Sequence, residues 1–290
     1  MKKERKIKVI YISGIGRSGS TLLDAVISTN HKVFSVGEIY KYNYLKKENL
    51  LCSCGKKFSE CFFWQNFLQD NSKIINRMNI KDYLIILNYL YNPFKEKIKF
   101  KNKSNNYKLF KRIKESLPKN KEYILDSSKD VARLIEFDND PRFNLYNITI
   151  FRDGRAVANS FNQKTQGPGK NYFISILKWI FINSILRRYQ KISNIKTLNV
   201  SYDYFSDNPD KEIKRIEDFL KIKIPQDYIS VIRKMNYHNI GGNRLGLKKN
   251  RRNIKEIKRD QKWETQQNFI SKLITTIITW PFNKIWVYKK

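Results

Sequence analysis

Acidic residues are scarce in this sequence. Against 58 Lys and Arg stand only 26 Asp and Glu, which gives a formal net charge of +32. Such an excess favours anionic partners, among them nucleotides, nucleic acids, acidic glycans and membrane surfaces. Lys, Asn and Ile are all abundant, as A+T-rich codons would make them, so the bulk charge does not choose among these partners. With 41% hydrophobic residues the composition is that of a globular protein.

A long apolar run is also missing, which argues against a membrane-spanning segment. Segment 171–192 is apolar on average, but Lys178 interrupts it and Arg187 and Arg188 end it, so we predict a buried helix. The C-terminal apolar stretch is short and contains Pro281; we predict a docked terminal helix, with peripheral membrane contact as the alternative. The basic N-terminus leads into a strand-like segment rather than a signal peptide, so we expect a cytoplasmic protein.

Cysteine and histidine are rare. Cys52, Cys54 and Cys61 lie close together in "LCSCGKKFSECFFW", while His31 and His238 are both distant in sequence. A disulfide would leave one thiol over, and a zinc site would lack an obvious fourth ligand. Our prediction is therefore that no metal is bound, with buried thiols, metal binding and redox chemistry left as the alternatives for these cysteines.

Strand-like and helix-like segments alternate along the chain. The predicted strands are 7–13, 32–38, 122–126, 145–151 and 195–202, and helical patterns follow them, including one that begins in "SSKDVARLIEF". This alternation predicts an α/β fold of three layers around a central parallel sheet. We predict a single domain over residues 1–290, in which 41–120 is a helical insertion on the acceptor side.

A glycine-rich loop, "GIGRSGST" at 14–21, follows the first predicted strand and leads into a helix. Its glycines and its threonine match the phosphate-binding pattern of nucleotide-binding P-loops, but Ser20 stands where the phosphate-reaching lysine belongs. Arg17 lies inside the loop instead. Because backbone N–H groups and the helix N-terminus favour an anion there, the loop predicts a phosphate site that differs from a kinase site.

Polar residues follow the other predicted strands too. Ligands of parallel α/β sheets gather at the carboxyl ends of the strands, so these residues are expected to converge. They are Arg17, Glu38, Ser127, Ser128, Lys129, Arg152 and Tyr202. Arginines and hydroxyls at two strand ends indicate a ligand with two anionic groups.

Several of these segments resemble sulfotransferases that use 3′-phosphoadenylyl sulfate (PAPS). "GIGRSGSTLL" looks like their 5′-phosphosulfate loop, and "IFRDGRAVANS" looks like their 3′-phosphate motif. "VSYDYFSDNP", "DSSK" and "HNIGGNRLGL" are supporting matches, and residues 62–120 lie outside the resemblance. In one place the pattern departs, because Gly154 stands where proline is usual.

The resemblance implies an enzyme that moves a sulfonate group from PAPS to a hydroxyl or amine and releases adenosine 3′,5′-bisphosphate. Its implied cofactor contacts are Arg17, Ser18, Gly19, Ser20 and Thr21 at the 5′ end, Arg152 and Ser160 at the 3′-phosphate, Tyr202 at the adenine, and Arg244 and Lys248 in a late loop. No metal is required in this scheme, because positive side chains and the helix terminus stabilise the leaving phosphate.

The catalytic base implied by the resemblance is Glu38, whose spacing from Arg17 is similar to that in tyrosylprotein sulfotransferases. Lys129 is the candidate that steadies the sulfonate or the bridging oxygen. His31, Asp126 and the 41–120 insertion hold the next candidates for the base.

Two other functions compete with sulfonate transfer. A P-loop kinase-like phosphotransferase would need the missing lysine and an acidic residue after a strand to bind a metal ion. Asp126 is the only acceptable candidate for that acid in the sequence. A basic non-enzymatic binder of nucleic acid or anionic membrane would cluster its cations on one face. We expect no specific nucleic acid partner. The acceptor, whether small molecule, glycan, lipid or peptide, and the oligomeric state are not determined by the sequence.

Overall fold

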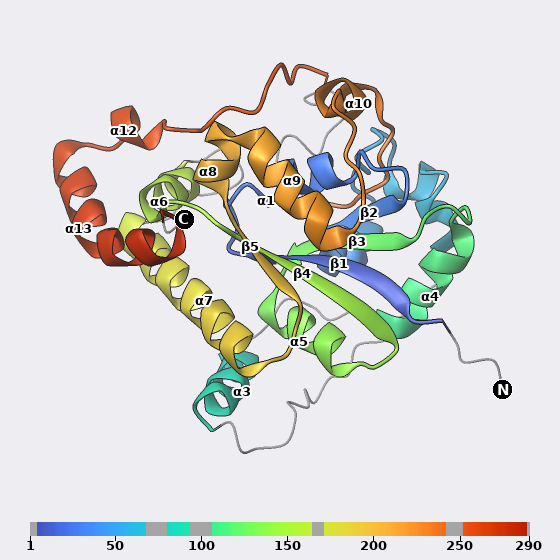
Figure 1. Ribbon diagram of the computed structural model, residues 1–290, viewed down its shortest axis with the longest axis horizontal. Coiled ribbons are helices and arrows are strands. Elements are labelled where there is room, and N and C mark those ends of the chain that lie inside the picture. The colour runs from blue at the N-terminus through green and yellow to red at the C-terminus, as the bar shows by residue number, and fades with distance from the viewer. Residues whose placement is uncertain (1–4, 68–79, 93–105, 164–170, 242–251, 289–290) are drawn as a thin grey trace.

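The computed structural model describes residues 5–67, 80–92, 106–163, 171–241 and 252–288. Within them, a sheet of five parallel strands runs through the centre of the molecule (Figure 1). The strands are β1 (Ile7–Gly14), β2 (Val33–Gly37), β3 (Tyr123–Lys129), β4 (Phe143–Phe151) and β5 (Thr197–Ser201), in the spatial order β2-β3-β1-β4-β5. The predicted α/β fold with a central parallel sheet is therefore confirmed.

Helices cover both faces of the sheet. The α-helices of the described residues are α1 (Ser20–Ile27), α2 (Tyr42–Lys47), α3 (Ile80–Tyr91), α4 (Asn106–Ser116), α5 (Val131–Asn139), α6 (Gly154–Asn162), α7 (Tyr172–Ile192), α8 (Tyr202–Asp207), α9 (Pro209–Leu220), α10 (Tyr228–Lys234), α12 (Trp263–Gln266) and α13 (Phe269–Trp286). Short 3₁₀-helices are η1 (Ile39–Lys41), η2 (Phe58–Glu60) and η3 (Trp64–Phe67).

The central strand β1 is buried on both faces, which explains its nearly continuous apolar sequence. Val9 and Tyr11 point into a core formed with α4, α5 and α7, whereas Ile10 and Ile12 point into a second core formed with α1, α9 and α10. Side chains alternate between faces along a strand, so one short segment joins both cores. Packing in the two cores fixes the position of β1 and of its carboxyl end, where the candidate site lies.

All five predicted strands are present, with boundary shifts. The largest shift concerns β3, which was predicted to end at residue 126 but continues through Lys129. Helix α5 begins at Val131, because the Asp130 side chain accepts a hydrogen bond from the backbone N–H of Arg133 and caps it. Ser127, Ser128 and Lys129 therefore belong to a strand end. The described part of 41–120 contains α2, α3 and α4, joined in part by the irregular loop 48–67; its role on the acceptor side remains a prediction.

Helix α13 has an inverted amphipathic character. Its buried residues are polar: Thr275, Thr279 and Asn283, spaced four residues apart, face α6 and α7. The terminal helix is docked, as predicted, but through its polar stripe, while most of its large apolar side chains are exposed. Among the described residues, no helix is both long enough and apolar enough to cross a bilayer.

Candidate active site

The carboxyl ends of β1, β2, β3 and β4 meet at one edge of the sheet. Ser13 pairs with Lys129, Gly37 with Asp126, and Gly14 with Ile150 in the strand register. The predicted residues Arg17, Glu38, Lys129 and Arg152 lie at these ends or in the loops that leave them. The structure therefore brings together the polar side chains that the sequence places after separate strands.

The glycine loop contains three residues with positive φ, of which the first is Gly14 at φ 147. Gly19 caps α1 at φ 91, and Arg17 adopts φ 70, which is uncommon for a residue with a side chain. Ser18 lies between them with its Oγ buried and without a hydrogen-bond partner among the described residues. A buried hydroxyl without a partner is costly, so this loop is suited to an added acceptor or donor beside the first turn of α1.

Tyr202 packs directly under this loop. A Cβ atom on Gly19 would lie 2.1 Å from Cδ2 of Tyr202, so only glycine fits. The Arg152 guanidinium lies 4.6 Å from the centre of the same ring. The structure thus places Tyr202 between the glycine loop and Arg152; its predicted role beside an adenine stays a prediction.

Arg152 follows β4 and is only 6% exposed. Its Nη1 donates to the carbonyl of Arg17 at 2.9 Å, and its Nη2 donates to the Asp260 carboxylate at 3.1 Å. Its backbone carbonyl accepts from Trp179 Nε1 at 3.0 Å, which fixes the residue from the other side. Its Nε is buried without a hydrogen-bond partner among the described residues, so a donor remains available for an anion.

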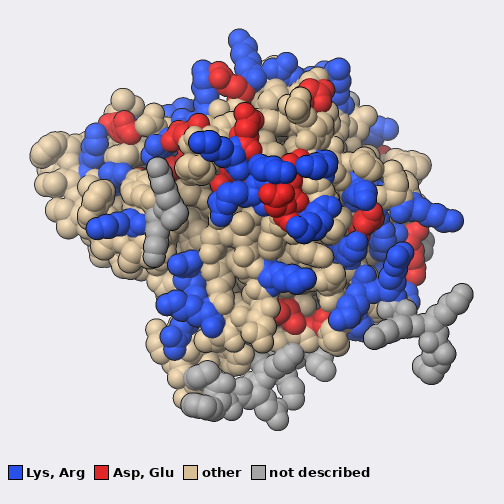
Figure 2. All heavy atoms as spheres, in the orientation of Figure 1, with Lys and Arg blue, Asp and Glu red and all other residues tan. Residues whose placement is uncertain are grey.

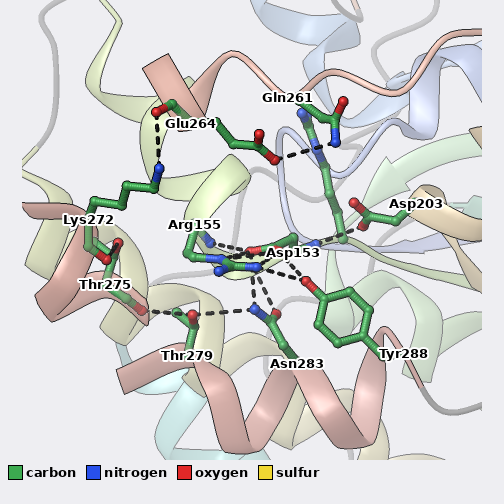
Figure 3. Close-up of polar contacts among 12 residues, drawn as sticks. Asp153, Arg155, Asp203, Gln261, Glu264, Lys272, Thr275, Thr279, Asn283 and Tyr288 are labelled. Atoms are coloured by element: carbon green, nitrogen blue, oxygen red, sulfur yellow. Dashed lines mark hydrogen bonds and ion pairs between the residues drawn. The ribbon is translucent and has the colours of Figure 1, made fainter. Parts of the chain in front are cut away.

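A polar network behind Arg152 fixes the start of α6 (Figure 3). Asp153 caps this helix by accepting from the Arg155 backbone N–H at 2.8 Å, and it also accepts from the Arg155 and Tyr288 side chains. The Asn283 side chain of α13 donates to the Asp153 carboxylate, and the backbone N–H of Asp153 donates to the Asp203 carboxylate. Burial raises the pKa of Asp153, but Arg155 and Tyr288 outweigh this and lower it, so the carboxylate stays ionised.

This network also accounts for Gly154. A Cβ atom there would lie 2.7 Å from Cγ2 of Thr279, because α13 packs closely against the start of α6. The Gly154 N–H also donates to Asn283 Oδ1 at 3.0 Å, a bond that proline could not make. The docked terminal helix therefore accounts for a glycine at the position where proline is usual.

Glu38 follows β2 and is 7% exposed. Lys129 Nζ donates to its Oε1 at 2.6 Å, and Lys41 Nζ lies 2.5 Å from its Oε2. Burial raises the pKa of Glu38, but the charges of the two lysines outweigh it and lower the pKa to about 2. Lys129 is held in the left-handed region at φ 67, a conformation that concentrates at functional sites.

Arg17 is half-buried between these two groups of charges. Burial lowers its pKa, the Glu38 carboxylate raises it, and the Arg152 guanidinium lowers it further. Phe161 of α6 lies against it, with the ring centre 6.0 Å from the guanidinium carbon. Ser160, which was predicted to contact the 3′-phosphate together with Arg152, is half-buried next to Phe161 in α6. The helix that carries Ser160 therefore contacts the glycine loop through Phe161.

Other predicted candidates lie elsewhere. His31 is exposed and precedes β2, at the edge of the sheet opposite Glu38. Asp126 is fully buried and accepts from Arg133 Nε at 2.5 Å. As alternative bases, both are wrong for this geometry, because the first is at the far edge and the second is engaged by Arg133. Arg244 and Lys248 lie outside the described residues.

The site includes residues that sequence reasoning missed. Asp260 pairs with Arg152, and Lys41 pairs with Glu38. Asp24 is buried in α1 and accepts from Ser28 and Ser35; burial raises its pKa to about 6, against the opposing effect of serine hydrogen bonds and of Lys129. Only Asp24 carried a signal, as a lone acid within the apolar helix "STLLDAVI".

A separate cavity of about 620 Å³ opens beside β5. It is lined by Asp203, Arg215, Arg259 and the end of α13, and by none of the predicted site residues. Because Asp203 also binds the backbone of Asp153, the cavity lies behind the candidate site rather than in it.

Comparison with known proteins relates the chain to solved structures only. No protein-family model matches the sequence, and no curated protein is similar to it. A sulfotransferase domain from the curacin biosynthetic pathway is 19% identical, with a TM-score of 0.54, over 96% of this chain and 98% of that domain. The sulfotransferase domain of the Synechococcus PCC 7002 olefin synthase is 16% identical, with a TM-score of 0.52, over 97% of this chain and 96% of that domain. The chain therefore has the fold of the sulfotransferases.

Proposed function

We propose that the protein is a sulfotransferase that moves the sulfonate group of PAPS to a hydroxyl or amine acceptor. The observation that carries this proposal is the pair of separate anion-binding features at one sheet edge. The first is the glycine loop with Arg17 and the buried Ser18 hydroxyl, and the second is the buried Arg152 guanidinium. Two such features fit a nucleotide with a 5′-phosphosulfate and a separate 3′-phosphate.

The donor contacts follow from the groups that the chain offers. The N–H groups at the start of α1, the hydroxyls of Ser18, Ser20 and Thr21, and the Arg17 guanidinium would hold the 5′-phosphosulfate. Arg152 would hold the 3′-phosphate through its unpartnered Nε and by exchanging its contact with Asp260. Ser160, Tyr202 and Arg244 keep the roles that the resemblance implies.

In the transfer step, the acceptor oxygen or nitrogen forms a bond to sulfur as the bond from sulfur to the 5′-phosphate oxygen breaks. The proton of the acceptor passes to the Glu38 carboxylate, and adenosine 3′,5′-bisphosphate leaves. Arg17, Lys129 and the N-terminus of α1 stabilise the negative charge that grows on the bridging oxygen. The positions of Glu38 and Lys129 beside one another support this division of roles.

Two observations weigh against the competing functions. A kinase would need Asp126 for a metal ion, but Asp126 pairs with Arg133 at 2.5 Å in the interior. A non-enzymatic nucleic acid binder would gather its cations in one patch, whereas on the face in Figure 2 Lys and Arg are spread out, with Asp and Glu between them.

A thermal-shift titration with adenosine 3′,5′-bisphosphate against ADP tests the proposal. We expect the first nucleotide to raise the melting temperature at concentrations where ADP does not, since only the first carries a 3′-phosphate. Labelled sulfonate should then pass from PAPS to an acceptor in cell extract without added divalent metal. Equal stabilisation by both nucleotides, or transfer that needs Mg²⁺, would support the phosphotransferase instead.

The exposed side of α13 supports a further part of the proposal, that the enzyme works against an anionic membrane surface. Large apolar side chains gather there, among them Phe269 at 79% and Trp280 at 55% exposure. Lys272 and Lys284 lie on the same helix. An apolar helix face flanked by cations is typical of helices that lie in a lipid interface. In Figure 2 the outer end of the lobe with α12 and α13 is mostly tan.

Vesicle sedimentation tests whether the exposed side of α13 binds a membrane or another protein. Wild-type protein should sediment with vesicles that contain phosphatidylserine and far less with pure phosphatidylcholine. Ile277→Ser should weaken sedimentation, and Leu84→Ser on α3, a similarly exposed position, serves as the matched control. A dimer in light scattering that Ile277→Ser dissociates, without vesicle binding, would refute the membrane role.

A further inference from the structure

Three cysteines and a histidine converge away from the candidate active-site charges. The ligand-type atoms of Cys52, Cys54, Cys61 and His238 all lie within 4.8 Å of one another. The sulfur atoms of Cys54 and Cys61 are 3.8 Å apart, and Cys61 Sγ lies 3.2 Å from His238 Nδ1. The histidine comes from 177 residues further along the chain, which is why the sequence showed no fourth ligand.

These distances are close to those around a tetrahedral zinc ion. With Zn–S bonds of about 2.3 Å and Zn–N bonds of about 2.0–2.1 Å, neighbouring sulfurs lie about 3.8 Å apart and a sulfur and a nitrogen about 3.6 Å apart. Three thiolates and one imidazole are a ligand set that selects zinc over the harder cations. A disulfide would use two of the sulfurs and leave the third thiol and the imidazole without a role.

The surrounding backbone holds the four ligands in place. Cys52 and Cys54 lie in a tight turn, closed by a bond from the Gly55 N–H to the Cys52 carbonyl at 2.9 Å, with Gly55 at φ 93. Trp64 Nε1 donates to the His238 carbonyl at 2.5 Å, and the Phe63 ring stacks on the imidazole with centres 6.0 Å apart. The two hydrogen bonds use backbone carbonyls and not the ligand atoms, so the fold brings the four side chains together without an ion.

We propose that Cys52, Cys54, Cys61 and His238 bind a structural Zn²⁺ ion. The three thiols lose their protons to solvent as the ion binds, and the imidazole coordinates in its neutral form through Nδ1. Because the chain supplies four ligands, no position is left for substrate, and the ion acts as a structural link rather than a catalyst. This revises the prediction of no metal without changing the proposed metal-free transfer step.

The link joins the irregular loop 48–67 to the segment that supports Glu38. Next to His238, the Ile240 N–H donates to Val36 at 3.0 Å, and the Ile240 carbonyl accepts from the Glu38 N–H at 2.6 Å. A Cβ atom on Gly241 would lie 3.1 Å from that of Glu38, so this segment also packs against the candidate base. The zinc site is therefore a positioning element for Glu38; this effect, unlike the metal site itself, rests on the proposed function.

Metal analysis of the purified protein tests the site directly. We expect one equivalent of zinc per chain, lost in His238→Ala and Cys61→Ser and retained in His31→Ala, the matched control on the exposed histidine. Cobalt substitution should give thiolate-to-metal charge transfer and the d–d bands of a tetrahedral site. Protein without zinc that resists added Zn²⁺ and Co²⁺, or that carries iron or an oxidised cysteine pair instead, overturns the proposal.

A second measurement covers variants that fail to fold. Wild-type protein stripped by a strong chelator should titrate three thiols that zinc had protected, and its melting temperature should fall by several degrees and recover with Zn²⁺. If zinc is present but removing it leaves transfer unchanged, only the positioning role fails. If no transfer occurs while zinc is bound, the proposed function fails and the metal site stands.

Discussion

Replacing Arg152 by alanine tests the part of the site that we propose distinguishes PAPS from other nucleotides. A charge-assisted hydrogen bond to the 3′-phosphate is worth roughly 1.5–3 kcal/mol. In the free protein the same guanidinium holds Asp260, whose side chain is 40% exposed, and such a contact is worth about 0.5–1 kcal/mol. The net loss is therefore about 0.5–2.5 kcal/mol, or about 2- to 70-fold in the dissociation constant of adenosine 3′,5′-bisphosphate.

Isothermal titration with two nucleotides measures this loss. The dissociation constant of ADP, which has no 3′-phosphate, should change by no more than about twofold. Arg142→Ala is the matched control, because Arg142 precedes the strand β4 that Arg152 follows and is an exposed arginine paired with Asp140. Equal losses for both nucleotides, in a variant whose melting temperature is preserved, would refute the assignment of Arg152 to the 3′-phosphate.

Further predictions concern the carboxylates of the site. Glu38→Gln should bind adenosine 3′,5′-bisphosphate normally but lower kcat by about 100-fold, near the weak end of general-base catalysis, and near-normal turnover would place the base elsewhere. Because the pKa of Glu38 is about 2, its ionisation should cause no change in the kcat of the wild-type enzyme above about pH 4. Asp260→Asn should tighten binding of the same nucleotide by a few-fold in calorimetry, and weaker binding would mean that Asp260 positions Arg152 rather than competing with the ligand. The pKa of Asp24 is raised to about 6 from 3.8, so its contribution to stability is present below about pH 4 and is lost as pH rises through 6. Asp24→Asn should therefore raise the free energy of unfolding by about 1.4 kcal/mol more at pH 8 than at pH 5, because about half of the full cost of ionising Asp24, about 3 kcal/mol, is already present at pH 5. Chemical denaturation at the two pH values measures this, and an equal change at both would show that its ionisation costs nothing.

The sequence predicted the sheet well because its strands are short, apolar and separated by helical patterns. It also placed Arg17, Glu38, Lys129 and Arg152 at strand ends, and a parallel sheet brings such ends together whatever the intervening chain does. The end of β3 was predicted too early because its apolar pattern ends at Asp126, while its backbone pairing continues to Lys129.

Contacts between distant segments could not be predicted. Asp260 reaches Arg152 across 108 residues, and His238 reaches Cys61 across 177. Neither pair has a spacing rule, because both depend on how the chain after α10 folds back over the strand ends. Gly154 is a similar case, since its reason lies in Thr279 of a helix that the sequence identified only as apolar.

The cations of the site are neutralised unequally before any ligand binds, and this sets how the site can respond to an anion. Arg152 holds a carboxylate that is 40% exposed, so a phosphate can replace Asp260 at little cost. Lys129 and Glu38 form a pair in which the side chains are only 11% and 9% exposed, and separating such a pair costs about 3–5 kcal/mol. The 3′ side should therefore exchange partners on binding, whereas Glu38 should keep Lys129 while the sulfonate approaches. A base that stays paired remains weakly basic, so the proton should leave the acceptor late, once the bond to sulfur has begun to form and the acceptor has become more acidic.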